Sequence, residues 1–203
     1  MAIENDNLPS ASRQVDQHQS FLVDSFTLLA WIKPHALNIG TKSAVVRQRG
    51  GNEESPGLYI INDKIVYEDY FGKNTNNTRV TYSGVSPSTL TTGFQQIAVT
   101  YSHTTGSFGV DNSDYESTLK FYHNDNLVFT QSQNICRDQD DRDALFQIGG
   151  AHFTSVQSRL DGGSSPGYAP FAGEIAVVGA YSITLSQAQI ADNYNRLRGR
   201  FGV

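Results

Sequence analysis

Short segments in which side chains alternate between two faces, separated by turn-forming residues, run through most of this chain. The residues from Phe26 to Ile32 place apolar side chains on both faces of a strand, and Pro34 ends the run because proline has no N–H to donate. We therefore predict a central strand here. Trp31 lies within it. A single Trp in an apolar strand is more often core than a platform for a sugar, so we interpret Trp31 as a core residue.

The same alternation predicts a series of further strands. Two pairs of them are joined by Asn62-Asp63 and by Asn124-Asp125, and such pairs enter left-handed turn conformations at low cost. These two connections are therefore predicted to be tight hairpins. The predicted strands cover residues 43–48, 57–62, 64–70, 79–82, 94–101, 119–123 and 126–131.

The last strand is expected between Phe171 and Tyr181, and it carries apolar side chains on both faces. Such a strand should lie inside a two-layer structure, so we predict a core strand. One face would hold Ala172, Glu174, Ala176, Val178 and Ala180, and the other would hold Ile175, Val177 and Tyr181.

One short amphipathic helix is expected after this strand, near residues 185–197. Thr184 or Ser186 can cap its first turn by accepting a hydrogen bond from the backbone. Ile190 and Tyr194 are four residues apart and would form its buried stripe. Gly199 is expected to end the helix because glycine tolerates positive φ.

Composition agrees with one all-β domain. The chain has 203 residues, 38% hydrophobic side chains and 18 glycines, which suits many turns and few long helices. Its single cysteine, Cys136, excludes an intrachain disulfide, so packing alone must hold the fold. Residues 1–19 are polar and show no period that would bury a face, so we assign them to an arm and residues 20–203 to the domain. The arm is either disordered or ordered by a neighbouring subunit.

Charge and hydropathy exclude two classes of partner. The net charge of −5 argues against nucleic acid, because binding to phosphates rests on a basic surface. The longest apolar runs, such as residues 28–32, are far shorter than the ~20 residues that a membrane-spanning helix needs, so no membrane partner is predicted. The first 20 residues also lack the basic start and apolar run of a secretory signal.

Several of these segments resemble one family when taken in order. The closing segment has Gly173, Ile175, Val178 and Tyr181 followed by a Leu-Ser helix start at Leu185 and Ser186. This pattern is similar to the end of the laminin-G-like, concanavalin A-like lectin and glucanase jelly rolls. The resemblance implies an all-β fold, a two-sheet antiparallel jelly-roll sandwich with one short C-terminal helix. Earlier segments that match are SFTLLAWIKP (25–34), FQQIAVTYS (94–102), LKFYHNDNLV (119–128) and FQIGG (146–150).

The chain departs from the family at a position that concerns calcium. Relatives often place an acidic pair in the last strand, whereas this chain has Ala176 and Val177. A structural calcium ion would therefore need loop carboxylates, since this ion prefers several oxygen ligands. The densest charge cluster, residues 136–143, can also be interpreted as a solvated loop in which Arg137 and Arg142 form ion pairs with the carboxylates. No cofactor other than calcium is expected. The candidate ligands are Asp111, Asp114, Glu116, Asp138, Asp140 and Asp141.

Catalytic patterns are missing from the sequence. Glycosidases of this fold flank the scissile bond with two carboxylates ~5–9.5 Å apart. Glu68 and Asp69 are neighbours in sequence and point to opposite faces of a strand, while Glu174 stands alone on its strand. The five histidines are scattered without zinc spacing. We therefore expect no enzyme activity.

A ligand patch is suggested by aromatic side chains next to polar groups. Tyr67 and Asp69 would share one face of a strand, and Tyr82 is expected on a nearby strand with Arg79 at its side. These residues could stack a sugar ring while the carboxylate accepts its hydroxyls. The alternative is that the tyrosines are packing residues, as tyrosines on a sandwich usually are.

We expect a non-enzymatic, lectin-like structural protein of a bacteriophage virion, such as a tail fibre, tail-associated or capsid-decorating protein. The ending NYNRLRGRFGV resembles the termini of jelly rolls from phage structural proteins. This resemblance implies other virion proteins, further copies of the chain (a trimer by analogy) and host cell-surface glycans as partners, with assembly in the host cytoplasm. The alternative is a carbohydrate-binding module of a secreted or cell-surface protein, and a glycanase or polysaccharide lyase comes third.

Overall fold

The computed structural model contains eleven strands and one helix within the residues that it describes. The arm, residues 1–19, and the boundary at residue 20 lie outside that part of the chain. The domain boundaries therefore stay a prediction. The described residues are 25–37, 40, 42–49, 57–73, 79–104, 116–133, 145–149 and 168–203.

Five strands form one fully antiparallel sheet in the order β11-β1-β6-β7-β8. The sheet brings the last strand of the chain next to the first. The short turn between β7 and β8 contains Asn124 with φ of 56°, as its Asn-Asp sequence predicts. The strands are β1 (Phe26–Pro34), β6 (Gln95–Thr104), β7 (Glu116–His123), β8 (Asn126–Gln133) and β11 (Gly173–Tyr181).

The second sheet contains six strands in the order β10-β2-β3-β4-β5, with β9 also paired to β2. Its pairs are antiparallel except for the short parallel pair of β10 and β2. Asn62, with φ of 54°, makes the predicted hairpin between β3 and β4. The strands are β2 (Lys42–Arg49), β3 (Gly57–Ile61), β4 (Lys64–Lys73), β5 (Arg79–Val85), β9 (Leu145–Ile148) and β10 (Tyr168–Pro170).

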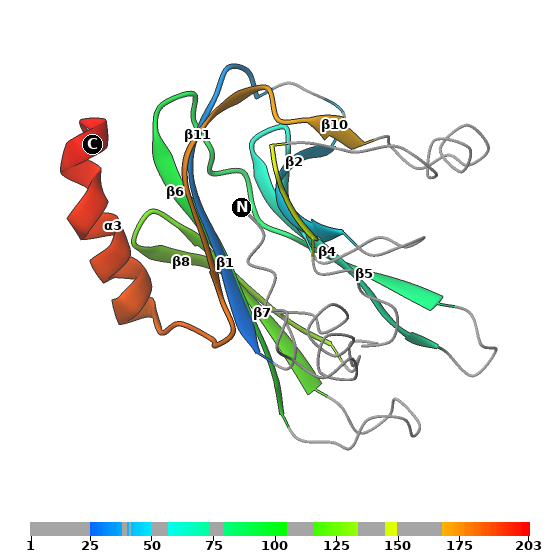
Figure 1. Cartoon of the computed structure of the whole chain (residues 1–203). Helices are drawn as coiled ribbons and strands as arrows, with labels where there is room; N and C mark the ends of the chain where they lie inside the picture. Colours follow the sequence, from blue (N-terminus) through cyan, green and yellow to red (C-terminus); the bar gives the residue numbers. More distant parts are fainter. Residues whose placement is uncertain are drawn as a thin grey trace, which may run out of the picture.

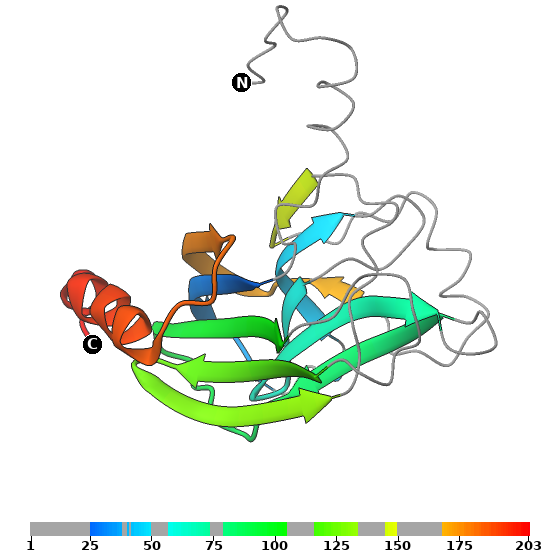
Figure 2. The same ribbon diagram turned by 90° about the horizontal axis from the view of Figure 1, so that it is seen from below.

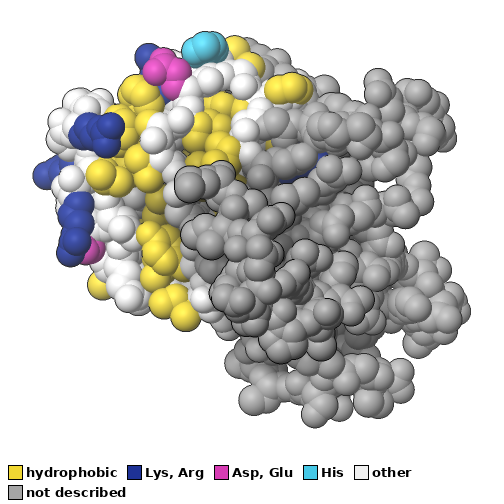
Figure 3. All heavy atoms as spheres, in the orientation of Figure 1, with side chains coloured by type: hydrophobic (Ala, Val, Ile, Leu, Met, Phe, Trp, Pro, Cys, Tyr) yellow, Lys and Arg dark blue, Asp and Glu magenta, His cyan; other side chains and the backbone are white. Residues whose placement is uncertain are grey.

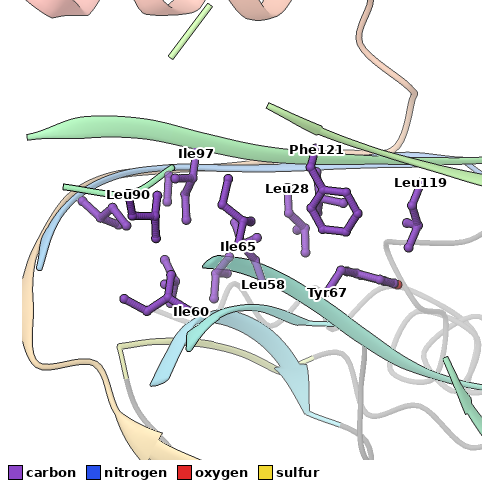
Figure 4. Close-up of a cluster of buried hydrophobic side chains, with 14 of the residues drawn as sticks. Leu28, Leu58, Ile60, Ile65, Tyr67, Leu90, Ile97, Leu119 and Phe121 are labelled. Carbon is purple, nitrogen blue, oxygen red and sulfur yellow. The ribbon is translucent and has the colours of Figure 1, made fainter. Parts of the chain in front are cut away.

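The two sheets pack face to face, as Figures 1 and 2 show from two directions. The core between them is made of alternate side chains from each sheet, which come from β1, β6 and β7 on one side and from β3 and β4 on the other (Figure 4). Each large apolar side chain buried in this way stabilises the fold by roughly 1.5–3 kcal/mol. The predicted all-β sandwich is confirmed. The core includes Leu28, Leu58, Ile60, Ile65, Ile97, Leu119 and Phe121.

The C-terminal helix, α3 (Gln187–Phe201), starts at Ser186, one of the two predicted caps. The Ser186 hydroxyl accepts from the Gln189 N–H, and the Gln189 side chain accepts from the Ser186 N–H, forming a capping box. The other candidate, Thr184, donates its hydroxyl to the Tyr101 carbonyl instead. No helix in the described part of the chain has the length and hydropathy to cross a membrane.

The helix is longer than its sequence suggested. Gly199 lies inside α3, so the prediction that it ends the helix is wrong. Gly202 ends it in a left-handed conformation with φ of 71°, and its N–H donates to the Arg198 carbonyl. The extra turn is retained because Phe201 packs on the sheet, which offsets the low helix propensity of Gly199.

α3 covers the outer face of the five-stranded sheet, the face that points away from the other sheet (Figure 1). Trp31 lies beneath it, fully buried, with its ring 5.5 Å from that of Tyr194 and 4.5 Å from that of Phe201. The prediction that Trp31 is a core residue is confirmed. Leu29, Ala98, Tyr122, Leu185 and Ile190 complete this second cluster.

β11 is the terminal strand of its sheet, and it carries the apolar side chains on both faces that its sequence predicted. It is apolar on both faces because both faces are covered: Ile175 and Val178 pack into the core, while Val177 packs under α3. The register shifts by one residue at Ala176, and this bulge brings Ile175 and Val178 to the same side, contrary to simple alternation.

Candidate functional site

The predicted ligand patch is centred on a residue that cannot reach a ligand. Tyr67 of β4 is fully buried between the sheets, with its ring 5.7 Å from that of Phe26 and close to Phe121 and Leu119 in Figure 4. The prediction that Tyr67 stacks a sugar ring is therefore wrong. Its face of β4 is the one that packs against the five-stranded sheet.

The other members of that patch are placed by their backbone only. Asp69 of β4 and Tyr82 of β5 are direct cross-strand partners, so the two residues lie on neighbouring strands as expected. Arg79 begins β5 opposite Lys73. The side chains of Asp69, Arg79 and Tyr82 lie outside the described part of the structure, and their role in ligand binding stays a prediction.

The opposite face of β4 points away from the core and carries a different polar group. Glu68 alternates with Tyr67 and therefore projects to this outer face of the six-stranded sheet. Its carboxylate pairs with the ammonium of Lys42 on β2. Because β3 lies between β2 and β4, this ion pair spans β3. The side chain of Glu68 is only 4% exposed and that of Lys42 is 18% exposed, so the pair is largely shielded from water.

An aromatic side chain and small apolar ones lie on the same face as the ion pair. Tyr59 of β3 stands between Ala44 of β2 and Val66 of β4 in one cross-strand row, and all three are buried. The ring of Tyr59 lies over Gly57, where an added Cβ would come within 2.5 Å of it. Gly57 thus lets the ring lie flat along its own strand.

Charge and polarity continue across the next row of the same face. Arg47 of β2 is the partner of Gly57, Gly57 is the partner of Glu68, and Glu68 is the partner of Ser83 on β5. The outer face therefore combines an aromatic ring, a carboxylate and two cationic side chains on three adjacent strands. Charged donors and acceptors of this kind make the stronger hydrogen bonds to polar ligands. We refer to Lys42, Arg47, Gly57, Tyr59 and Glu68 as the outer-face site.

The outer-face site was not predicted from the sequence. Tyr59 and Glu68 lie in strands that were predicted, and Glu68 was considered only as half of a catalytic pair. The missing information was which face of β4 points outward, since Ile65 and Val66 make both faces apolar. The signal that could have been used is Gly57, two residues before Tyr59, because a glycine inside a strand often marks a close approach.

The other sheet carries a second, more exposed polar cluster. Lys33 of β1 and Glu174 of β11 are cross-strand partners, and their side chains, 40% and 50% exposed, are 2.8 Å apart. The hydrogen bond from Lys33 lowers the pKa of Glu174, and the charge of His35 acts in the same direction. The Lys33 ammonium also lies 5.3 Å from the centre of the Phe94 ring. The cation therefore already makes a cation–π contact with this ring, which a stacking sugar would have to displace on that side.

A third polar group joins a loop to the turn between β7 and β8. The Gln95 amide nitrogen donates to the carbonyls of Thr91 and Gly93, so its oxygen faces His123, 2.9 Å from Nε2. The Nε2 of His123 is therefore the donor. Burial lowers the pKa of His123, which favours the neutral ring. Burial also raises the pKa of Tyr122, the preceding residue.

A metal centre is not formed by the described residues, in which no group of three His, Cys, Asp or Glu side chains comes together. Most of the predicted calcium ligands, namely Asp111, Asp114, Asp138, Asp140 and Asp141, lie outside this part of the chain. Glu116 begins β7, but its side chain is not described. Calcium binding by these loops therefore stays a prediction.

The chain belongs to the concanavalin A-like lectin/glucanases superfamily, whose sequence model matches residues 9–191. The match covers most of the chain and agrees with the family that the strand motifs indicated. It ends within α3, before Tyr194 and Phe201. No curated protein matches the chain in sequence.

Two solved structures with a similar fold are binding domains by name. The CBM40 domain of the Ruminococcus gnavus IT-sialidase bound to α2,3-sialyllactose has a TM-score of 0.58 at 18% identity, covering 94% of this chain and 90% of its own. The binding domain of Paraclostridial Mosquitocidal Protein 1 has a TM-score of 0.53 at 12% identity, covering 87% of this chain and 38% of its own. At these identities the likeness concerns the fold alone.

Proposed function

We propose that this protein is a non-enzymatic glycan-binding domain that uses the outer face of its six-stranded sheet. The observation that carries the proposal is the Lys42–Glu68 ion pair, held across β3 beside Tyr59 in a jelly roll of a lectin family. Membership of that family and a fold like that of a domain bound to sialyllactose support the same function.

The chemistry of this face suits a polar, ring-shaped ligand. Sugars offer hydroxyls that both donate and accept hydrogen bonds, and Glu68 and Lys42 supply an acceptor and a donor on one surface. Lys42 and Arg47 are the more exposed members of the outer-face site, and we infer that a glycan meets them first. Glu68 then orients the Lys42 ammonium, and Tyr59 with Gly57 forms the apolar floor beneath them.

A glycan array followed by titration calorimetry tests this proposal. The titrations would use α2,3- and α2,6-sialyllactose and any glycan that the array identifies, at one fixed salt concentration. The informative variant is Lys42→Met with Glu68→Leu, which removes both charges together and leaves neither one unpaired. We expect it to weaken glycan binding at least about tenfold, equivalent to about 1.4 kcal/mol.

The chain offers a matched control in its other cross-strand ion pair. Lys33→Met with Glu174→Gln removes a Lys–Glu pair from the five-stranded sheet and should leave glycan affinity unchanged. Equal loss in both double variants, or loss in the control alone, would place the binding site elsewhere. Failure of the wild-type protein to bind any glycan on the array would overturn the proposed function itself.

The absence of catalysis is part of the proposal. Glu68 is engaged by Lys42 and is not accompanied by a second carboxylate on its face of the described strands, whereas glycoside cleavage uses two. Incubation with each bound glycan, followed by mass spectrometry, should return the glycan intact. Release of a shorter sugar or of an unsaturated fragment would identify a glycanase or a lyase.

The biological setting has two candidate forms. A carbohydrate-binding module of a secreted or cell-surface protein is favoured by the names of the structural neighbours, which are parts of a sialidase and of a mosquitocidal protein. A bacteriophage virion protein, with other virion proteins and further copies of the chain as partners, is supported by the sequence ending 193–203 and by the polar arm, residues 1–19. Immunogold labelling of purified phage particles would support the virion setting, and retention of the protein on host-cell glycans without any particle would support the module.

A further inference from the structure

A hydrogen-bond donor and an acceptor without partners lie under α3. The indole N–H of Trp31 and the side-chain oxygen of Gln96 are both fully buried, and neither has a hydrogen-bond partner in the part of the chain that the structure describes. Trp31 and Gln96 are direct cross-strand partners on β1 and β6. The Cβ atoms of such partners are about 4.5–5.5 Å apart, on the same face of the sheet. A lone donor and a lone acceptor are therefore neighbours in one buried layer.

The orientation of the Gln96 amide is determined by its other hydrogen bonds. Its nitrogen donates to the carbonyls of Asn124 and Ile190, both at 3.1 Å, so both of its hydrogens are used. An exchange of the amide oxygen and nitrogen would turn the oxygen toward two carbonyls that only accept. The backbone N–H of Gln96 also donates to the Asn124 side chain. Gln96 is thus held on two sides, and its oxygen is left as an acceptor.

The rings stacked on Trp31 do not accept its N–H. Tyr194 and Phe201 lie over the indole, with planes inclined to it by 2° and 28°. The N–H lies in the plane of the indole, so it points past both rings and not into their π faces. The indole nitrogen is a donor only, and a buried donor without an acceptor is costly. Trp31 therefore needs a partner from outside this stack.

The charged side chains of α3 face away from this layer. In Figure 3 the Lys and Arg side chains on the α3 side stand at the surface, beside a band of hydrophobic side chains. The charged residues of the helix are exposed, namely Asp192, Arg196, Arg198 and Arg200. The partner of the buried donor and acceptor must therefore be small enough to lie beneath the helix.

We propose that one buried water molecule binds between Trp31 and Gln96, accepting from the indole N–H and donating to the amide oxygen. Two hydrogen bonds of about 2.9 Å let a single water join atoms that are roughly 5 Å apart. Buried waters make roughly two to four hydrogen bonds with polar groups that otherwise have no partner. Trp31 and Gln96 supply two of these.

This water belongs to the attachment of α3. The Gln96 side chain already joins β6 to the turn between β7 and β8, through Asn124, and to the helix, through Ile190. The water extends this connection to Trp31 on β1, the residue on which the aromatic rings of α3 stack. Both sheets separate it from the outer-face site, so glycan binding and the water site can be tested independently.

Nuclear magnetic resonance of the isotope-labelled full chain tests for the water directly. Trp31 is the only tryptophan, so the spectrum holds a single indole N–H signal. This signal should show cross-peaks to water of opposite sign in laboratory-frame and rotating-frame Overhauser spectra, as a water that stays bound for longer than the protein takes to tumble produces. Cross-peaks of equal sign, which report proton exchange with the solvent, or the lack of any cross-peak would overturn the proposal.

Two variants separate the water from other sources of the signal. Gln96→Met keeps the length of the side chain but removes the acceptor, so the water cross-peaks should be lost. The matched control is Gln95→Met, the adjacent buried glutamine on the other face of β6, which should retain them. Tyr122→Phe removes a hydroxyl from the cluster under α3 and should also retain them. Cross-peaks that persist in Gln96→Met, or that vanish in Tyr122→Phe, would contradict the water site.

A crystal structure of the wild-type protein that resolves ordered waters gives a measurement without any substitution. One water should lie within about 3.2 Å of both the Trp31 Nε1 and the Gln96 Oε1 atoms. A direct hydrogen bond between the two side chains, or no water at this position, would overturn the proposal even where Gln96→Met does not fold.

Discussion

The indole ring of Trp31 and the phenol ring of Tyr194 lie parallel, with centroids 5.5 Å apart and planes inclined by only 2°. Phe201 stacks on the same indole with a centroid distance of 4.5 Å. The helix α3 is thus attached to the sheet through three aromatic rings on one side, while its other side faces solvent. Aromatic pairs of this kind add roughly 0.5–1.5 kcal/mol each beyond the area that they bury.

Removal of one ring should loosen the last turns of α3. We expect Phe201→Ala to lower the free energy of unfolding by about 2 kcal/mol, less than the ~3–5 kcal/mol of a fully buried Phe because Phe201 is half-buried. Trp31 is the only tryptophan, so its emission should shift to longer wavelength if water enters under the helix. The exposed Asn195→Ala serves as a control and should change stability by no more than about 0.5 kcal/mol.

A single hydroxyl ties the turn before α3 to the sheet. Thr27 donates to the Ile183 carbonyl and accepts from the Leu185 N–H, both at 2.9 Å. Thr27→Val keeps the shape but leaves both backbone groups without this partner, and we expect a loss of about 2 kcal/mol in chemical denaturation. Thr130→Val, at an exposed position, should be nearly neutral, and an equal effect of both changes would contradict the role of the hydroxyl.

The core has no room beside Gly84. A Cβ added there would lie 2.7 Å from Phe121 and 2.9 Å from Leu119, both of which are fully buried. Gly84→Ala should therefore destabilise the protein by roughly 1–3 kcal/mol through overpacking. At Gly93 an added Cβ meets only the Thr91 hydroxyl, at 3.7 Å, so Gly93→Ala should be tolerated. Comparison of the two midpoints in urea checks this difference.

Stability should depend on pH through His123. Burial lowers the pKa of His123 in the folded state below its ordinary 6.5, so the unfolded chain takes up this proton at a higher pH than the folded protein does. The free energy of unfolding should therefore fall as the pH decreases from about 6.5 toward the folded pKa. The same measurement on His123→Gln should lack this component. Glu174, whose pKa is lowered, contributes only at more acidic pH, below about 4.5.

Replacing only one partner of the Lys42–Glu68 ion pair should lower the free energy of unfolding. Glu68→Leu leaves Lys42 without this carboxylate in a site where it is only 18% exposed. We expect a loss of about 3 kcal/mol in stability, at the low end of the ~3–5 kcal/mol found for buried pairs. Lys42→Met added to Glu68→Leu should restore much of it. Glu174→Gln, in the exposed pair of the other sheet, should have little effect on the melting temperature.

Local signals in the sequence were sufficient where one residue determines a backbone conformation. Asn62 and Asn124 both adopt the positive φ that their turns require. Ser186 caps α3 because its hydroxyl accepts a hydrogen bond from the N–H of Gln189, the third residue of the helix. These features depend on a few neighbouring residues. For the same reason the family and most of the strands could be predicted from the sequence, although several strand ends differ by up to three residues and β10 was not predicted.

Features that depend on distant packing could not be read in this way. Gly199 looked like the end of the helix because the contact of Phe201 with Trp31 is invisible in the sequence. The sequence does not show which face of its strand packs against the other sheet, so it could not show that Tyr67 is a core residue while Tyr59, also buried, lies on the opposite face of the sheet. The bulge at Ala176 likewise follows from pairing with β1.

The position of α3 has a practical consequence for how the protein can be presented to cells or glycans. The helix and the C-terminus at Val203 lie on one side of the sandwich, and the outer-face site lies on the other, with both sheets between them (Figure 1). A tether at Val203 would therefore hold the molecule with the β2-β3-β4 surface turned away from the support. Immobilisation through this end keeps Lys42 and Arg47, both half-buried, on the side of the sandwich that faces away from the support.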